Sequence, residues 1–406
     1  MELTEQEQYR RQSLDTLRQM GINPYPAAMY PTDAFSDEIR ANFSDDAEPR
    51  LVCIAGRMMS RRVMGKASFV ELQDSKGRIQ VYISRDDIDT PEQPEMYNIV
   101  FKKLLDIGDF IGVRGEVFRT RTGEISVHCK ELKVLSKALR PLPIVKYKDG
   151  VAYDAFEDPE QRYRQRYVDL VVNDGVKEIF LKRTKTYTSM REFFNSFGYT
   201  EVETPILQAI PGGASARPFI THHNALNIPL YMRIADELYL KRLIVGGMDR
   251  VYEVGRIFRN EGMDPKHNPE FTTVELYQAY ADYHDMMDIT ERMVRFCATK
   301  VCDSLHISYQ GIPLDLESAW ERLTMVDAVK KYTGLDFDNQ PLAELIDAAN
   351  DKGLDISKDE TWGNTLAKVF DAFVEDKLNG PVFIYDYPIE ISPLAKKKPT
   401  DHRLTE

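Results

Sequence analysis

Short runs of alternating apolar and polar residues between positions 51 and 140 constrain the fold of this chain more than any other feature. Alternation with a period of two predicts half-buried β-strands. Turn signals, such as Ser75-Lys76-Gly77, separate the runs. Five strands in about 90 residues predict a small closed barrel of the oligonucleotide-binding type, the OB-fold. The five runs are Leu51–Arg57, Ala67–Gln73, Arg78–Ser84, Phe110–Phe118 and Glu124–Leu132.

Composition divides the 406 residues into four regions. Residues 1–50 are expected to form a helix over residues 4–20, which Gly21 ends, followed by a proline-rich connector. Residues 51–140 are the barrel, and residues 141–160, which contain several prolines, are expected to be a linker. Residues 161–406 show long helical patterns followed by strands, which predicts a larger α+β domain. A chain of this length can bury more than one core.

The bulk composition excludes some classes of protein. The chain has no run of about 18 apolar residues, the length of a membrane-spanning helix. The N-terminus, Met1–Glu7, is acidic and lacks the features of a signal peptide, so we expect a cytoplasmic protein without membrane contact. The four cysteines form no CxxC pair, which favours buried thiols. The net charge is −12, but residues 51–140 contain more basic than acidic residues, which permits local phosphate contact.

A polar loop between two alternating segments carries the clearest chemical signal. It runs from Phe258 to Phe271 and includes Arg259, Glu261 and His267. Two strands joined by this loop would form a hairpin. Arginine offers a planar fork for phosphate oxygens, and Phe271 offers a flat apolar face for an aromatic base. The segment therefore suits a bound nucleoside triphosphate.

A helix–strand–proline unit precedes this hairpin. Residues Lys177–Phe197 carry apolar side chains near a 3.6-residue period, and Gly198 ends the predicted helix. The following residues, Tyr199–Pro205, alternate as a strand and stop at proline. Two further segments lie between this unit and the hairpin. They are Pro211–Phe219, which contains two adjacent glycines, and Ile234–Arg242, which opens another helix.

In this order, the segments resemble the class II aminoacyl-tRNA synthetases. The helix–strand–proline unit resembles motif 1 of that family, and the Phe258–Phe271 hairpin resembles motif 2. Three segments resemble the lysyl enzymes of bacterial type in particular, and the resemblance covers nearly all of residues 51–395. These three segments are Pro211–Phe219, Ile234–Arg242 and Glu275–Tyr277.

The resemblance implies a fold and an activity. The fold would be a catalytic domain over residues 161–406, with an antiparallel sheet flanked by helices, a helical insertion at about 314–380 and a homodimer formed through motif 1. The activity would join L-lysine to lysine tRNA in two steps, with ATP as a substrate and Mg²⁺ as a cofactor. The lysine carboxylate would attack the α-phosphorus of ATP. A ribose hydroxyl at the 3′ end of the tRNA would then attack the adenylate.

The resemblance also implies roles for residues of the catalytic domain. Arg259 is expected to be the catalytic residue, because it would bridge the lysine carboxylate and the α-phosphate. The residues expected to bind lysine are Gly213 and Glu237 at the α-amino group, and Glu275 and Tyr277 at the ε-ammonium group. The residues expected to bind ATP, besides Arg259, are Glu261 and His267 beside the nucleotide and Phe271 on the adenine.

In the barrel, the resemblance implies an anticodon site. An aromatic side chain can stack on a splayed base, while amide and carboxylate groups read the base edge. A competing interpretation makes Phe69 an ordinary residue of the barrel core. The residues expected to bind the anticodon are Phe69, Gln80, Glu124 and Arg62, and Arg61, Arg62 and Arg119 are expected on phosphates.

The chemistry of the substrate allows a separate check. A pocket selective for lysine needs at least two carboxylates and one cation. Glu237, Glu275 and Arg259 supply them, and Glu275 and Tyr277 face the same side because they lie two apart on a strand. The nearest alternative is an aspartyl or asparaginyl synthetase, but Glu237 would repel a second substrate carboxylate. Another alternative makes Glu275 a structural carboxylate paired with Arg233 or Lys241.

The sequence also departs from the family. A class II core contains motif 3, a Gly-x-Gly-x-Gly run before an arginine, and nothing here matches it. The Mg²⁺ ligands of the lysyl enzymes would lie beyond Glu406, so we assign no metal ligand in this chain. We therefore expect the 406-residue chain by itself to be inactive in adenylate formation. The alternative from another class is a non-catalytic tRNA- or lysine-binding protein that keeps the barrel and part of the pocket.

Overall fold

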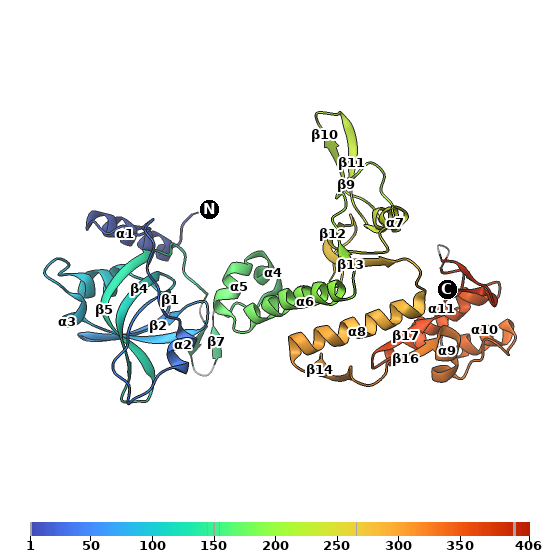
Figure 1. Cartoon of the computed structure of the whole chain (residues 1–406). Helices are drawn as coiled ribbons and strands as arrows, with labels where there is room; N and C mark the ends of the chain where they lie inside the picture. Colours follow the sequence, from blue (N-terminus) through green and yellow to red (C-terminus); the bar gives the residue numbers. More distant parts are fainter. Residues whose placement is uncertain (1, 144, 149–150, 154, 265, 393–394) are drawn as a thin grey trace. The chain divides into compact units, whose positions relative to one another are not determined.

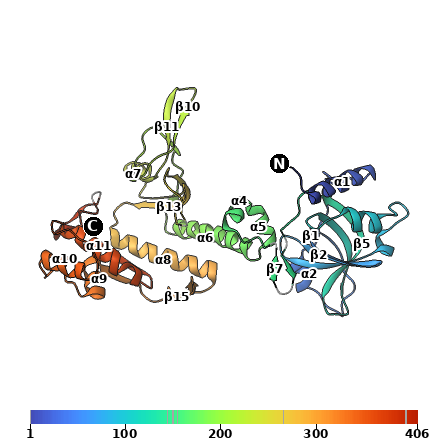
Figure 2. The same cartoon turned by 180° about the vertical axis from the view of Figure 1, so that it is seen from behind.

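The computed structural model describes residues 2–143, 145–148, 151–153, 155–264, 266–392 and 395–406. The chain forms two compact units, Met1–Val176 and Lys177–Glu406, and each is described by itself. Figure 1 shows the course of the chain, and Figure 2 shows it from behind. The predicted fold class, an OB-fold barrel followed by an α+β core, is confirmed.

The first unit is built on a closed barrel of five strands in the order β1-β2-β3-β5-β4. Predicted and observed bounds agree for β2 and β3, but β1 continues past Arg57 to Met64. The first half of β1 pairs with β4 and the second half with β2, with a bulge between Met58 and Ser60. A bulge adds a residue and bends the strand, which hides it from a search for strict alternation. The strands are β1 (Leu51–Met64), β2 (Ala67–Gln73), β3 (Arg78–Ser84), β4 (Phe110–Arg119) and β5 (Ile125–Ser136).

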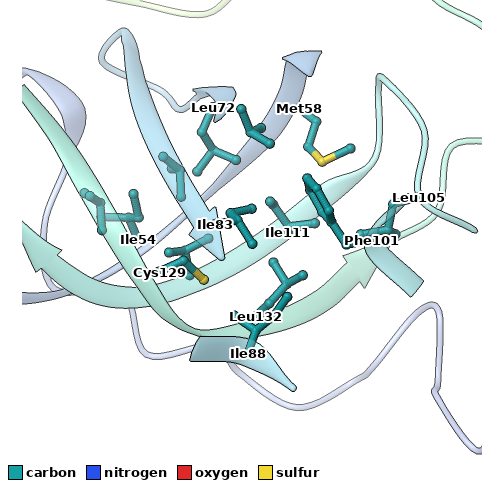
Figure 3. Close-up of a cluster of buried hydrophobic side chains, with 14 of the residues drawn as sticks. Ile54, Met58, Leu72, Ile83, Ile88, Phe101, Leu105, Ile111, Cys129 and Leu132 are labelled. Atoms are coloured by element: carbon teal, nitrogen blue, oxygen red, sulfur yellow. The ribbon is translucent and has the colours of Figure 1, made fainter. Parts of the chain in front are cut away.

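Apolar side chains fill the interior of the barrel. Figure 3 shows side chains of all five strands meeting there, with Phe101 and Leu105 at one side. Phe101 comes from a π-helix, Met96–Leu104, and Leu105 follows it; the short helix α3 (Arg85–Ile88) adds Ile88. The sequence pattern did not predict these two helices. The strand residues labelled in Figure 3 are Ile54, Met58, Leu72, Ile83, Ile111, Cys129 and Leu132.

The N-terminal segment packs onto the barrel. The helix predicted over residues 4–20 is present as α1 (Glu5–Gln19), and Thr4 caps it through the backbone of Glu7. Buried Arg10 on this helix donates to the carbonyls of Ile107 and Ala138 at 3.0 and 3.1 Å. A second helix, α2 (Ser36–Ala41), interrupts the segment expected to be only a connector.

The predicted linker contains secondary structure, although residues 144, 149–150 and 154 lie outside the described part. A short antiparallel pair and two helices follow the barrel. Asp169 on the second helix is buried and binds the side chains of Arg162 and Arg166. The elements are β6 (Lys146–Lys148), β7 (Val151–Tyr153), α4 (Pro159–Arg164) and α5 (Arg166–Val172).

The second unit contains the predicted hairpin and the helix–strand unit. The hairpin is β12 (Arg250–Phe258) with β13 (Glu270–Gln278), and β8 (Thr200–Glu201) lies parallel to β12. Helices α6 (Val176–Ser196) and α8 (Tyr283–Cys302) pack together, with the rings of Phe193 and Phe296 5.7 Å apart. Both views show this pairing (Figures 1 and 2).

The strand predicted over Tyr199–Pro205 is shorter in the structure. Only Thr200–Glu201 has strand geometry, and Val202 still donates to the carbonyl of Tyr252 at 2.9 Å. After that point, the backbone N–H of Thr204 donates to the side chain of Glu253 at 3.1 Å. The buried carboxylate of Glu253 thus accepts the backbone hydrogen bond that a neighbouring strand would otherwise accept.

Other parts of the second unit form smaller layers. A separate apolar core joins three helices of the region predicted as a helical insertion and the strand pair β16–β17, of which β17 follows that region. The elements of this part are β16 (Glu321–Thr324), α9 (Met325–Thr333), α10 (Leu342–Asp351), α11 (Trp362–Phe373), the 3-10 helix Glu375–Lys377 and β17 (Val382–Tyr385). The remaining elements are β9 (Leu207–Gln208), β10 (Ile220–His223), β11 (Ile228–Met232), α7 (Glu237–Val245), β14 (His306–Tyr309), β15 (Ile312–Asp315), β18 (Lys397–Lys398) and β19 (Asp401–Thr405).

Two expectations about the whole chain can be compared with the structure. Among the described residues, no helix is both long and apolar enough to cross a membrane. Cys53, Cys129 and Cys297 are buried, as predicted. The prediction was wrong for Cys302, which is exposed because it lies at the end of α8.

Candidate functional site

Arg233 fixes the segment before α7 onto strand β12. Its side chain is almost fully buried and donates to Glu253 at 2.6 Å and to the carbonyl of Arg256 at 2.7 Å. Glu253 also accepts from the hydroxyl of Thr204 at 2.7 Å. Gly255 makes room for this network, because a Cβ there would stand 2.2 Å from a guanidinium nitrogen. The network determines where the residues after Arg233 lie.

Gly255→Ala should therefore lower the free energy of unfolding of the second unit. The added methyl group would displace the guanidinium from Glu253, and breaking a buried pair typically costs roughly 3–5 kcal/mol. Chemical denaturation followed by circular dichroism would measure the loss. Gly262→Ala is the matched control, because a Cβ at Gly262 meets nothing within 4 Å. Equal stability of the two variants would contradict the packing described here.

The structure brings together four of the five residues predicted for lysine binding, Arg259 being described below. Gly213 has a φ of +88°, and a Cβ there would lie 3.2 Å from the Cβ of Glu237. The hydroxyl of Tyr277 donates to Glu275 at 3.2 Å. Burial and the charges of Glu275 and Glu237 raise the pKa of Tyr277, so its hydroxyl stays protonated as a donor. Helix α7 packs on β12 and β13, which places Glu237 near the two β13 side chains.

A further acidic residue, Asp236, lies in this pocket, and the sequence did not single it out. Its side chain is fully buried, and neither oxygen receives a hydrogen bond from a donor in the described part of the chain. Burial and the neighbouring carboxyl of Glu275 raise its pKa from 3.8 to about 7. The only sequence signal was its place at the start of α7, where aspartate commonly caps a helix, but this side chain does not cap.

The nearby cations are paired with other carboxylates. Arg233 binds Glu253, and the ammonium of Lys241 binds Glu237 at 2.5 Å. Within the described residues, no ion pair joins Glu275 to a protein cation. The alternative interpretation, in which Glu275 is a structural partner of Arg233 or Lys241, therefore finds no support in the geometry. Glu275 has a charge that a ligand cation could match.

Arg259 contacts both Phe271 and the segment that leads into α7. The backbone N–H of Arg259 donates to the carbonyl of Pro269 at 2.8 Å, which closes the hairpin loop. Its guanidinium lies over the ring of Phe271, 5.3 Å from the ring centroid, and contacts the carbonyl of Ile234 at 3.4 Å. Ile234 precedes Asp236 by two residues, so Arg259 contacts the segment that carries Asp236.

The other two residues predicted for ATP lie on the exposed loop of the hairpin. The carboxylate of Glu261 accepts from the backbone N–H of Arg217 at 3.4 Å, which ties this loop to the glycine-containing segment. His267 is exposed, and its ring contacts the carboxylate of Asp264 at 2.7 Å. This hydrogen bond lowers the pKa of Asp264. Pro265, between them, lies outside the described residues.

No metal site is apparent in the described part of the chain, because no three of its His, Cys, Asp and Glu side chains are grouped closely enough to hold an ion.

In the first unit, a cavity of about 510 Å³ gathers all four residues predicted for the anticodon. Phe69 is only partly buried, while its neighbours Ser68 and Val70 are buried inside the barrel. Phe69 therefore points outward, and the interpretation of Phe69 as a core residue was wrong. The guanidinium of Arg62 lies 5.4 Å from the Phe69 ring centroid. The lining residues are Arg40, Ser60, Arg62, Phe69, Val70, Glu71, Gln80 and Glu124.

Polar groups in this cavity already have partners. Glu124 pairs with Arg40 at 2.9 Å, and the amide oxygen of Gln80 accepts from the hydroxyl of Ser126 at 3.0 Å. Two of the arginines expected on phosphates have partners within the unit. Arg61 donates to the carbonyls of Phe101 and Leu105 at 2.5 and 2.8 Å, and Arg119 pairs with Asp45 at 2.9 Å. Arg62 is exposed and keeps its guanidinium at the cavity.

Comparison with known proteins gives the same division of the chain. Residues 158–406 match the family model described as tRNA synthetases class II (D, K and N), and residues 52–135 match the model of an OB-fold nucleic acid binding domain. A protein of Porphyromonas gingivalis (strain W83), named a lysine–tRNA ligase, is 56% identical over 408 residues, covering 100% of this chain and 71% of that relative.

Two further relatives carry the same name. The lysine–tRNA ligase of Azobacteroides pseudotrichonymphae is 52% identical over 404 residues, which cover 100% of this chain and 81% of the relative. That of Thermoanaerobacter sp. (strain X514) is 50% identical over 398 residues, which cover 98% of this chain and 77% of the relative.

Proposed function

The chain belongs to the class II lysyl-tRNA synthetases, and we propose from this premise that it activates L-lysine with ATP and passes it to lysine tRNA. The acidic pocket carries the proposal. Glu237 and Glu275 line it, Arg259 contacts the carbonyl of Ile234 just before α7, and Glu275 is paired with no protein cation among the described residues. Such a pocket suits a substrate with two ammonium groups and one carboxylate.

The pocket argues against an aspartyl or asparaginyl substrate. An aspartate side chain would bring a second carboxylate toward Glu275 and Asp236, which is unfavourable in a buried site. A neutral asparagine side chain would leave the charge of Glu275 without a partner. Both enzymes share the matched family model, so the distinction rests on these two carboxyl groups and on the relatives' names.

In the proposed first step, Glu237 and Gly213 hold the α-amino group, and Glu275 and Tyr277 hold the ε-ammonium group. Arg259 holds the lysine carboxylate against the α-phosphate of ATP. The carboxylate attacks the α-phosphorus in line, a new carbon–oxygen–phosphorus link forms, and pyrophosphate leaves. No protein nucleophile is needed, because the substrate carboxylate attacks. The chain contributes positioning and stabilisation of the charge on the phosphate.

The nucleotide is proposed to lie along the hairpin. Phe271, already covered on one side by Arg259, offers a ring for adenine, while Glu261 and His267 lie on the loop beside it. Mg²⁺ commonly accompanies the phosphates of ATP. Among the described residues, no three His, Cys, Asp or Glu side chains are grouped to hold an ion, and we assign no step to the metal.

In the second step, a ribose hydroxyl at the 3′ end of lysine tRNA attacks the adenylate. The barrel is proposed to hold the anticodon of the same tRNA. The outward ring of Phe69 would stack on one base, while Gln80 and Glu124 read base edges and Arg62 contacts phosphate. Because Glu124 is paired with Arg40, reading by Glu124 requires that this exposed ion pair open or share its carboxylate.

Phe69→Ala should weaken binding of a lysine anticodon stem-loop by about 1–3 kcal/mol, the usual contribution of one base stacked on an aromatic ring. Fluorescence anisotropy at two salt concentrations would measure the affinity of the full chain. Phe110→Ala is the control, since Phe110 stacks with Arg57 elsewhere on the barrel and does not line the cavity. Unchanged affinity of the Phe69 variant, with the barrel folded, would remove Phe69 from the site.

The remaining parts of the proposal concern assembly and activity. We propose a cytoplasmic homodimer formed through α6, where Ile179 and Leu181 expose apolar side chains. That the 406-residue chain forms no adenylate by itself stays a prediction, which lysine-dependent ATP–pyrophosphate exchange would check. The same assay distinguishes the proposed enzyme from a non-catalytic tRNA- or lysine-binding protein. Exchange that depends on lysine, in this chain or in a chimera with the part of the Porphyromonas gingivalis relative outside the match, supports the enzyme.

A further inference from the structure

Asp236 is a buried acidic residue to which the proposed reaction steps assign no role. Its carboxyl group is fully buried at the start of α7, and neither oxygen accepts a hydrogen bond from a donor in the described residues. The carboxyl of Glu275 is close enough to raise the pKa of Asp236 through a hydrogen bond and through its charge. A hydrogen bond between two carboxyl groups exists only if one of them carries a proton. The geometry therefore calls for a proton between them.

The charged groups around Asp236 and Glu275 also indicate a proton between these two carboxyls. Glu237 from α7 is paired with Lys241, and Glu253 from β12 is paired with Arg233. Tyr277 from β13 donates to Glu275 but carries no charge. Glu253 also stands directly across from Glu275 in the strand register. After these pairings, Asp236 and Glu275 are the two carboxyls left without a cation among the described groups facing the pocket.

We propose that Asp236 and Glu275 share a single proton in the free pocket, and that the side-chain ammonium of the substrate lysine takes the place of that proton. The proton leaves to solvent, so one positive charge enters as another departs. Asp236 acts here as a positioning residue, because it holds the Glu275 carboxyl and supplies its second charge. This inference rests on the proposed lysine site.

Electrostatics explains why the exchange is favourable. Two carboxylates in a desolvated site cannot both ionise without a large cost, so one keeps a proton. An ammonium group between the two carboxylates neutralises their repulsion, so both can ionise. The raised pKa of Asp236, about 7, agrees with a proton that is present near neutral pH in the free site. The pair titrates as a unit, so the proton belongs to both groups.

The first test is calorimetric titration of the full chain with lysine in buffers of different ionisation enthalpy. The wild type should release close to one proton per lysine at about pH 6, and less as the pH rises above the raised pKa. Asp236→Asn keeps the shape of the side chain and should release almost none. Norleucine, which lacks the ε-ammonium group, should release none from either protein. Lysine binding to the wild type without proton release, or equal release by the variant, would overturn the proposal.

The second test needs no ligand and separates this proposal from the proposed function. Because the folded chain keeps a proton on the pair between pH 3.8 and about 7, stability is lost as the pH rises through this window. The Tm of Asp236→Asn relative to wild type should therefore increase from about pH 4 to about pH 7 and then stay constant. Asp347→Asn, an exposed change of the same charge, should show no such trend. A flat difference for Asp236→Asn contradicts proton sharing, whereas the expected trend without lysine binding would retain it and reject the lysine site.

Discussion

Glu275→Gln should lower the affinity for lysine about 100-fold or more, equivalent to about 2.7 kcal/mol. The substitution keeps the shape of the side chain and one acceptor, but it removes the charge that faces the ε-ammonium group. An ammonium buried without its partner is costly, and losses of this size are typical when one member of a buried pair is removed. Norleucine has no ε-ammonium group, so the affinity for norleucine should fall far less. Discrimination between lysine and norleucine should therefore shrink in the variant, as measured by calorimetry.

Glu237→Gln provides the matched comparison. Glu237 is assigned to the α-amino group, which lysine and norleucine share, so this variant should weaken the binding of both ligands alike. The melting temperature separates a binding role from a structural one. Since Arg233 and Lys241 are paired with Glu253 and Glu237, loss of the Glu275 charge should not reduce Tm. Equal losses for lysine and norleucine in Glu275→Gln, together with a lower Tm, would contradict the assignment to the ε-ammonium group.

Arg259→Lys should slow adenylate formation about 100- to 1000-fold, the size of effect seen when a donor to a developing oxyanion is removed. Lysine keeps the charge but loses the planar fork that can hold a carboxylate and a phosphate oxygen at once. Charge on the α-phosphate grows in the transition state, so turnover should suffer more than ground-state binding of ATP. Single-turnover measurement of adenylate would separate the two effects.

This experiment needs an active parent protein. The 406-residue chain serves if it supports exchange, and the chimera with the Porphyromonas gingivalis relative serves otherwise. Arg256→Lys is the control, because Arg256 lies on β12, three residues before Arg259, with an exposed side chain. A near-normal rate for Arg259→Lys would remove Arg259 from the catalytic role, while slow turnover in both variants would point to damage of the hairpin.

Local patterns predicted most of the elements that position the site. Alternation gave β2 and β3 with correct bounds, and it also implies that Phe69 faces outward when Ser68 and Val70 face inward. The hairpin was predicted because strand alternation stops at a loop rich in polar and turn residues. Such features depend on neighbours in sequence, so a sequence shows them.

The features that the sequence missed depend on contacts between distant segments. The π-helix Met96–Leu104 is defined by its packing against the barrel, and the bulge in β1 by pairing with two different strands. Asp236 resembles an ordinary helix cap in sequence. Only the packing of α7 on β13 buries its carboxyl beside Glu275. Likewise, Phe101 and Leu105, which accept from Arg61, and Asp45, which pairs with Arg119, lie 40 or more positions away in the chain, so these contacts could not be predicted.

The most direct measurement of the central claim is side-by-side calorimetric titration of the chain with L-lysine, L-aspartate and L-asparagine. An acidic pocket built from Glu237, Glu275 and Asp236 predicts saturable binding of lysine and no detectable binding of the other two. Binding of aspartate or asparagine as tight as that of lysine, or the absence of lysine binding by the folded chain, would contradict it.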